Sequence, residues 1–459
     1  MGLRISGCRD HHATRRAFLG RATEVVPVPA DALDGLERFA REGGLTRRNL
    51  LERGVGLWVG SAALAGLSTR GLLEAAQAQA QAAPDATILV SLYLDGGNDG
   101  LNTLIPLADP RYRELRSHVA IAPETTLPLP DTKDFGWHPA AKGLSQLYDA
   151  GKLAVLPAVD FQNADQSHFN SVAYWRRGIV GPSFETTGWL GRTLDAVGTA
   201  DNPLQGVSAS WSPDPVLVSK RAATATVYDP GGFSFGIEGV WERDGFVRAY
   251  REVASGKTGS AALAAARRTY ENAFRVQDQL APLRVDEKSL PPTPVAYPDS
   301  HLGTGLRNLA RLLGAGFGTR VAALSISGFD THDDQPERHT ELLTDLGDSL
   351  WAWQADLTAR GLSSRVLTLL WSEFGRRPED NDSSGTDHGA GGLVMLVGDR
   401  ANGGIRSEFP GLSRLDEDDN LLVTTEFRTV YASLLEGWLG VEAARVLPKI
   451  DAARIPLVK

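Results

Sequence analysis

The chain has 459 residues, of which 42% are hydrophobic and 22% are charged, a composition typical of a globular protein with a large core. Its formal net charge of −9 argues against nucleic acid as a partner, because nucleic-acid binding draws on a basic face. The single cysteine, Cys8, lies near the N-terminus, so we expect no disulfide, thiolate ligand or cysteine nucleophile in the rest of the chain.

The first 83 residues have the organisation of an export signal. The segment Thr46-Arg47-Arg48 is followed by an uncharged apolar run at residues 54–66, which is too short to span about 30 Å of hydrocarbon. Residues 75–83 then alternate Ala and Gln and offer several A-x-A cleavage sites. This order predicts a secretory signal of the twin-arginine (Tat) type. We therefore expect a periplasmic or secreted protein that keeps no stable membrane span after cleavage.

A second arginine pair, Arg15-Arg16, is followed by prolines and acidic residues at 25–37 where a signal needs an apolar run. We therefore predict that the pair at Arg47-Arg48 directs export. Residues 1–44 are then either an extended n-region or the product of an upstream start site. The alternative for the apolar run is a buried helix that begins the fold.

From residue 84 onward, short apolar runs with the β-branched content of buried strands alternate with amphipathic stretches. In chain order we expect a strand at 87–94, a helix at 140–150, a strand at 152–159, helices at 261–280 and 302–313, a strand at 320–327, a helix at 337–357, strands at 365–371 and 393–397, and a helix at 426–439. Residues 84–459 are therefore predicted to form one α/β domain, a doubly wound, mostly parallel sheet with helices on both faces. The Pro-, Gly- and Ser-rich start of residues 193–298 predicts an inserted or capping region there.

Residues whose side chains could bind a ligand or act in catalysis follow the predicted strands, at the place where ligands bind in sheets of this kind. They are Asp95 and Asp99 after the first strand, Ser167 and His168 after the second, Asp330 and His332 after the third, Glu373 and Arg376 after the fourth, and Asp387 and His388 before the fifth. Carboxylates and imidazoles without sulfur suit Zn²⁺, Mn²⁺, Fe or Mg²⁺. The set is large enough to bind one or two divalent ions, and two ions can clamp the attacking and leaving oxygens of a phosphoryl or sulfuryl group.

Several of these residues have more than one interpretation. Ser167 is either a nucleophile or the cap of a helix that starts beside it. His168 is a base, a metal ligand or a packed core imidazole. Glu373 is a ligand or an ion-pair partner of Arg376 or Arg377.

Seven segments, taken in order, resemble the DUF1501 family of exported bacterial proteins, within the alkaline phosphatase and sulfatase superfamily. The segments are Gly96-Gly97-Asn98-Asp99-Gly100-Leu101-Asn102, Trp137-His138-Pro139, Ser167-His168-Phe169, Gly188-Trp189-Leu190-Gly191-Arg192, Gly328-Phe329-Asp330-Thr331-His332, Glu373-Phe374-Gly375-Arg376 and Gly385-Thr386-Asp387-His388-Gly389. The resemblance covers nearly all of residues 86–440 and implies an alkaline-phosphatase-like fold with a one-metal or two-metal site at the strand ends. It also implies that Asp99 is a better candidate ligand than Asp95.

The chain departs from the superfamily at two points. Glu373-Phe374-Gly375 stands where similar phosphatases have Asp-His-Gly, and Ala390 stands where family members often have another histidine.

Together these features predict an exported, metal-dependent hydrolase of phosphate or sulfate esters. We expect its partner to be a small anionic ester or an envelope polymer. Ser167 would attack, Arg376 would hold the anion, and the metal would be bound by Asp99, Asp330, His332, Asp387 and His388. The alternative is a non-catalytic scaffold of the same fold that binds an envelope polymer or a partner protein. The family resemblance implies an exported protein as that partner.

Overall fold

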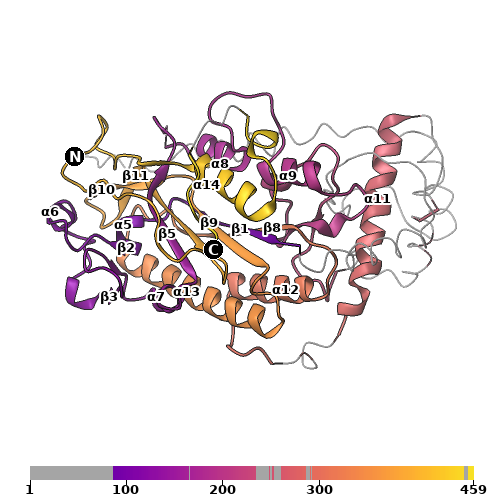
Figure 1. Cartoon of the computed structure of the whole chain (residues 1–459), viewed down its shortest axis with the longest axis horizontal. Helices are drawn as coiled ribbons and strands as arrows, with labels where there is room; N and C mark the ends of the chain where they lie inside the picture. The colour runs from indigo at the N-terminus through magenta and orange to yellow at the C-terminus, as the bar shows by residue number, and fades with distance from the viewer. Residues whose placement is uncertain are drawn as a thin grey trace, which may run out of the picture. The chain divides into compact units, whose positions relative to one another are not determined.

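The computed structural model describes residues 86–164, 166–233, 260–285, 292–448 and 453–459, with residues 245, 248, 251, 252 and 290 (Figure 1). The predicted export signal, both arginine pairs and the cleavage region lie outside the described residues. The chain divides into two compact units, Met1–Leu57 with Gly256–Leu263 and Trp58–Ser255 with Ala264–Lys459. Nearly all described residues belong to the second unit, which contains the sheet and the candidate site.

The second unit is built on a nine-stranded sheet. Its strands are β1 (Ile88–Asp95), β5 (Leu153–Asp160), β6 (Gly206–Ser208), β7 (Ala225–Thr226), β8 (Val321–Ser327), β9 (Val366–Trp371), β12 (Gly392–Val397), β13 (Gly404–Ile405) and β14 (Thr425–Glu426). Their order is β13-β5-β12-β9-β1-β8-β6-β7, with β14 beside β5. Every neighbouring pair is parallel except those of β12, which runs antiparallel to β5 and β9. The predicted mostly parallel sheet is therefore confirmed.

Helices cover both faces of the sheet (Figure 1). The α-helices of the described residues are α5 (Gly100–Thr103), α6 (Arg111–Leu115), α7 (Lys142–Asp149), α8 (His168–Arg177), α9 (Trp189–Val197), α11 (Ala261–Leu280), α12 (His301–Gly314), α13 (Gln335–Ala359) and α14 (Phe427–Leu434). In the view of Figure 1, α7, α12 and α13 lie below the sheet, and α8, α9 and α14 lie above it. The doubly wound arrangement is therefore confirmed as well.

The remaining elements are short. Strands β2 (Leu104–Ile105), β3 (Leu127–Pro128) and β4 (Gly136–Trp137) form a small antiparallel sheet, and β10 (Gly375–Asp380) pairs antiparallel with β11 (Thr386–Gly389). The 3₁₀ helices are Pro123–Thr125, Pro203–Gln205, Pro215–Leu217, Ala281–Leu283 and Ala443–Arg445, and a π-helix, Leu435–Leu439, continues α14. The β10–β11 pair matters most for the site, because it carries His388.

The side chains of β1 point alternately into two hydrophobic cores, one on each face of the sheet. Leu92 points into the core that includes Leu306 of α12 and Leu350 of α13. Tyr93 points into the opposite core, where Trp175 of α8 stacks on Trp371 at 5.4 Å between ring centroids. Because successive side chains of a strand point to opposite faces, one apolar run supplies both layers.

Part of residues 193–298, predicted as an insertion or cap, instead belongs to the main sheet. β6 and β7 lie in this region and extend the sheet beyond β8. The two strands have only three and two residues, which is too short to show as a periodic apolar run.

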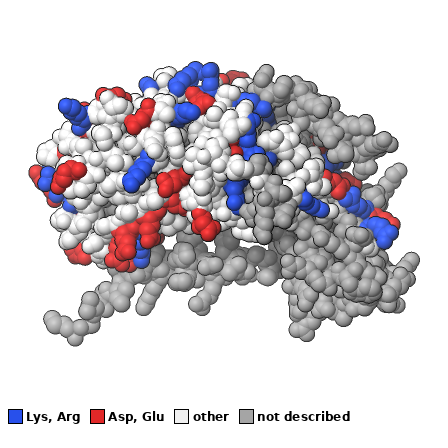
Figure 2. Space-filling view, turned by 90° about the horizontal axis from the view of Figure 1, so that it is seen from below, with Lys and Arg blue, Asp and Glu red and all other residues white. Residues whose placement is uncertain are grey.

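The described surface carries mixed charge. In the face shown in Figure 2, basic and acidic side chains are interspersed, with one gathering of acidic side chains at the lower left. Among the described residues, no helix combines the length and the hydrophobicity that a membrane crossing requires.

Helices α7 and α13 approach closely at two glycines. A Cβ added to Gly143 would lie 2.0 Å from the carbonyl oxygen of Gly347, whereas a Cβ added to Gly347 would lie no closer than 3.2 Å to Gly143. The contact therefore requires Gly143 to lack a side chain and constrains Gly347 much less.

We predict that Gly143→Ala lowers the free energy of unfolding by about 1–3 kcal/mol, because the two helices must separate to admit the methyl group. Gly347→Ala, its matched control, should lower the unfolding free energy clearly less. Its added methyl group approaches Gly143 less closely, and the preference of a helix for Ala over Gly, about 1 kcal/mol, offsets that approach. Denaturant unfolding measures both. Equal losses in the two variants would contradict the helix contact.

Candidate metal centre

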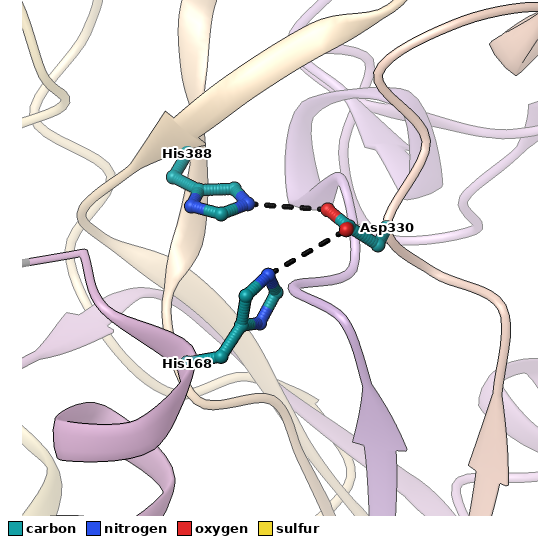
Figure 3. Close-up of side chains that lie close together, drawn as sticks. All are labelled: His168, Asp330 and His388. Atoms are coloured by element: carbon teal, nitrogen blue, oxygen red, sulfur yellow. Dashed lines mark hydrogen bonds and ion pairs between the residues drawn. The ribbon is translucent and has the colours of Figure 1, made fainter. Parts of the chain in front are cut away.

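Three histidines and one aspartate meet just beyond the carboxyl end of β8. His168 is the first residue of α8, Asp330 and His332 lie in the loop between β8 and α13, and His388 lies on β11. Figure 3 shows His168 and His388 pointing at the carboxylate of Asp330 from two sides. Segments more than 200 residues apart in sequence therefore converge on one point.

The same ring nitrogen of each histidine faces the common centre. Asp330 Oδ1 lies 3.1 Å from Nε2 of His332 and 3.1 Å from Nε2 of His388. Asp330 Oδ2 lies 3.5 Å from Nε2 of His168, and the Nε2 atoms of His332 and His388 are 3.0 Å apart. Ligand atoms of His168, Asp330 and His388 thus lie within 4.8 Å of one another, and Nε2 of His332 adjoins the last two.

The other ring nitrogen of each histidine contacts an oxygen that can only accept a hydrogen bond. Nδ1 of His168 lies 2.8 Å from Glu373 Oε1, and Nδ1 of His332 lies 3.1 Å from Asp387 Oδ1. Nδ1 of His388 lies 3.0 Å from the main-chain oxygen of Gln166. Each Nδ1 can therefore donate to its oxygen, and a ring protonated only at Nδ1 would leave its Nε2 lone pair free to bind a cation at the centre. Metal-binding histidines are held in this way.

This donor set fits a divalent cation. Without a cation, Nε2 lone pairs face one another and a carboxylate at 3.0–3.5 Å, an arrangement that is repulsive unless protons are taken up. Three imidazoles and one carboxylate are the ligands preferred by Zn²⁺, Mn²⁺ and Fe, whereas Mg²⁺ prefers oxygen. The four side chains are 19–47% exposed, which leaves room for a further ligand from solvent, as in catalytic sites.

Electrostatics in the cation-free protein agree with this fit. Burial lowers the pKa of His168, but hydrogen bonds to Asp330 and Glu373 outweigh it and raise the pKa to about 9. Burial opposes ionisation of Asp330, yet hydrogen bonds from the three histidines hold its pKa well below the usual range. The hydrogen bond to Asp330 raises the pKa of His332, and burial lowers that of His388. A proton on His168 thus supplies positive charge beside Asp330 that a cation would otherwise bring.

Comparison with known proteins identifies the family. A family model described as a protein of unknown function (DUF1501) matches residues 165–436, which include all four residues of the centre. The chain belongs to the DUF1501 family. The family resemblance seen in the sequence is therefore confirmed.

Two solved structures are similar to this chain at low levels. The PsFucS1 sulfatase from Pseudoalteromonas sp. has 13% sequence identity and a TM-score of 0.34, and the match covers 84% of this chain and 75% of that chain. A TAB5 alkaline phosphatase mutant with Mg bound in the M3 site has 10% identity and a TM-score of 0.28, covering 68% of this chain and 91% of that chain. No curated protein sequence matches the chain.

Glu373, predicted as a metal ligand, lies behind His168 in this DUF1501 protein. Its buried carboxylate accepts hydrogen bonds from the backbone N–H groups of Gly96 and Gly97, both at 3.1 Å, and from His168. Both glycines have positive φ, 119° and 80°, which points their N–H groups at one acceptor. Glu373 therefore orients His168, and its own oxygens are engaged away from the candidate centre.

Asp387, also predicted as a ligand, lies behind His332. Its Oδ1 accepts from His332 Nδ1 and from Asn381 Nδ2 at 3.2 Å. The sequence neighbours Asp387 and His388 sit on a strand, where adjacent side chains diverge, so only His388 faces the centre.

Asp95 and Asp99 do not reach the centre. Asp95 accepts hydrogen bonds from the hydroxyls of Tyr93 at 3.0 Å and Ser327 at 3.1 Å. Asp99 caps α5 and forms a fully buried ion pair with Arg116 at 2.6 Å. Burial opposes ionisation of Asp99, but Arg116 outweighs it and lowers the pKa. Asp99, predicted as a ligand, thus lies away from the centre, with its oxygens bonded to Arg116 and Gln335.

Arg376, predicted to hold a substrate anion, is fully buried and bonded to the protein. Nε donates to Gly97 O at 2.8 Å and Nη1 to Thr386 O at 2.7 Å. Nη2 contacts Gly96 O, Phe329 O at 3.0 Å and Asp330 Oδ1 at 2.7 Å. With no exposed side-chain surface, the guanidinium is not available to an anion from solvent.

Ser167 is the N-cap of α8, as one of its two interpretations requires. Its Oγ accepts from the backbone N–H of Asn170 at 3.5 Å. The residues on either side of it, Gln166 and His168, both contact the histidine cluster. The cap therefore lies on the segment that borders the candidate metal centre.

Sequence reasoning missed Gln335, the first residue of α13. Its Oε1 accepts from the hydroxyls of Thr331 at 3.0 Å and Thr386 at 2.7 Å, and its Nε2 donates to Asp99 at 2.6 Å. Thr331 lies between Asp330 and His332, and Thr386 is two residues before His388. Gln335 thus ties both ligand segments together, but a single glutamine at a helix start carries no sequence signal for this role.

We predict that Gln335→Leu weakens metal binding by about 10- to 100-fold, because the ligand segments lose their shared anchor. The matched control is Gln354→Leu on the same helix, where the buried glutamine bonds to Asp399 instead. Titration calorimetry with Zn²⁺ measures the affinity, and thermal unfolding reports stability separately. Equal affinities in the two variants would contradict the role of Gln335.

A pair of buried histidines near Asp99 predicts acid sensitivity. His339 Nε2 lies 3.0 Å from Asn98 Oδ1, and burial lowers the pKa of His339 to about 3 and of His138 to about 4. The unfolded chain binds a proton on each near pH ~6.5, so the unfolding free energy falls as pH decreases from there toward 4.

His339→Gln should make the unfolding free energy fall less steeply as the pH decreases, because one of the two groups that gain protons on unfolding is removed. Denaturant unfolding in the presence of chelator, from about pH 7.5 to 4.5, gives the slope of the unfolding free energy against pH for wild type and for the variant. An unchanged slope would show that His339 does not titrate as its burial requires.

Proposed function

We propose that this protein is an exported, metal-dependent hydrolase of phosphate or sulfate esters. The observation that carries the proposal is the convergence of three Nε2 atoms on Asp330 while every Nδ1 contacts an accepting oxygen. A structural role alone would not need three imidazoles aimed at one solvent-accessible carboxylate.

His168, His332, His388 and Asp330 would hold the cation. When bound, it would act as a Lewis acid on an oxygen of the ester and lower the pKa of the attacking group. Glu373, Asp387 and the carbonyl of Gln166 keep the three imidazoles in the required tautomer.

Ser167 is the nucleophile in this proposal. It stands at the N-terminus of the ten-residue helix α8, where backbone N–H groups and the helix dipole favour negative charge on its oxygen. Its Oγ would form a bond to phosphorus or sulfur as the bond to the leaving alcohol breaks, with the hydroxyl proton passing to that alcohol. Water would then cleave the serine ester, releasing phosphate or sulfate and restoring Ser167.

The exposure of the centre supports substrates from a small ester up to an esterified envelope polymer. Asp330 and His332 are 47% and 42% exposed, so a bulky group attached to the ester can remain in solvent. Export by the twin-arginine route stays part of the proposal, because it delivers proteins that have folded and acquired their metal first. An exported protein partner is likewise proposed from family membership.

One observation favours a second candidate, a non-catalytic scaffold that binds an envelope polymer or a partner protein. The ring of Phe374 packs 4.9 Å from that of His168 and 4.5 Å from that of His388, at the position where a phosphatase would have an imidazole. Arg376, which is fully buried, could not hold an anion at the centre either. The scaffold would contain no stoichiometric metal.

We predict that Asp330→Asn removes both bound metal and ester hydrolysis, whereas Ser167→Ala keeps the metal and loses about 10³-fold or more in kcat. Elemental analysis gives metal content, and screens with phosphomonoesters, phosphodiesters and sulfate esters give activity. Wild-type protein with neither metal nor activity would identify the scaffold.

The control for Ser167→Ala is Ser300→Ala, which removes the equivalent cap of α12. Both changes remove an N-cap and should each lower the unfolding free energy by about 1 kcal/mol, but only Ser167→Ala should affect hydrolysis. Full activity in Ser167→Ala would assign attack to water instead of serine.

A further inference from the structure

The candidate centre offers ligands for one cation and not for two. The carboxylates that a second cation would need are engaged elsewhere: Asp95 by hydroxyls, Asp99 by Arg116, Glu373 by backbone N–H groups and His168, and Asp387 by His332 and Asn381. Among the described residues, His168, Asp330 and His388 form one cluster whose ligand atoms lie within 4.8 Å of one another. His332 adds its Nε2 atom, 3.1 Å from Asp330 Oδ1 and 3.0 Å from His388 Nε2.

A fixed positive charge already lies beside Asp330. The Arg376 guanidinium is surrounded by five oxygens, the main-chain oxygens of Gly96, Gly97, Phe329 and Thr386 and Oδ1 of Asp330. An enclosure of carbonyl oxygens with one carboxylate is the environment that hard metal cations prefer. In this protein the Arg376 side chain occupies the enclosure.

The charges balance with a single divalent cation. The four ligands and their hydrogen-bond partners include three carboxylates (Asp330, Glu373 and Asp387) and one guanidinium (Arg376). Their sum of two negative charges is neutralised by one divalent cation. A second would leave two uncompensated positive charges in a half-buried site, which is costly.

We propose that the centre binds one divalent cation and that Arg376 occupies the place of a second. The inference rests on the proposed function, since it assumes that the histidine cluster binds metal. Arg376 is then a positioning residue: it fixes Asp330 and closes the oxygen enclosure to a second ion.

Metal counting tests the stoichiometry. The full chain is saturated with Zn²⁺ or Mn²⁺, freed of excess metal and analysed by elemental analysis. We expect one ion per chain in wild type and in Asp95→Asn, and none in Asp330→Asn. Two ions in wild type would overturn this inference and leave the proposed function standing. None in wild type would overturn the proposed function itself.

Chemical rescue tests the role of Arg376. We expect Arg376→Ala to unfold at a lower temperature and to regain stability with millimolar Ca²⁺ or methylguanidinium, which fit the vacated oxygens, but not with tetramethylammonium. Wild type should show no such stabilisation by methylguanidinium. A folded variant that neither cation stabilises would overturn the role of Arg376.

Arg376→Lys keeps a positive charge in the enclosure and provides a second measurement if Arg376→Ala does not fold. We expect it to retain one ion per chain. Two ions in Arg376→Lys would show that the charge at this position does not exclude a second cation, and would overturn the proposal.

Discussion

The buried guanidinium of Arg376 is the contact on which the rest of the site depends. A buried charge is costly unless it is paired and hydrogen-bonded, and here three segments supply the partners: the loop after β1, the loop after β8 and the start of β11. The latter two carry Asp330, His332 and His388. One side chain thus fixes the relative positions of ligands that no local interaction would hold together, and Gln335 repeats this link through neutral hydrogen bonds.

The glycine loop after β1 acts on the site indirectly. Two consecutive glycines with positive φ point their N–H groups in one direction and create a small anion-binding concavity. In many proteins such a concavity binds a substrate anion. Here it is filled by Glu373, whose carboxylate then accepts the Nδ1 proton of His168. The loop therefore acts through Glu373 to set the tautomer of His168.

The sequence predicted the sheet, most of its helices and the residue types of the site, because buried strands and amphipathic helices leave periodic patterns. It also placed His168, Asp330, His332 and His388 at the strand ends, where the structure brings them together. Spacing along the chain does not specify which atom points inward, so Glu373 and Asp387 were predicted as ligands, whereas their carboxylates contact the outward Nδ1 atoms of His168 and His332. Asp99 was misplaced for the same reason, since nothing near it in sequence indicates that Arg116 would pair with it.

The full burial of Arg376 constrains how this site could recognise an ester. Phosphate and sulfate binding usually draws on arginine, whose planar guanidinium forms paired hydrogen bonds to oxygen. The Arg376 side chain has no exposed surface, so a bound cation and the N-terminus of α8 beside Ser167 would have to supply attraction for an anion in its place. A site of this kind would bind anions weakly when the cation is absent, because the carboxylates of Asp330 and Asp387 then face the solvent. Loading of the cation, and with it the state of the histidine tautomers, would therefore control substrate binding as well as chemistry.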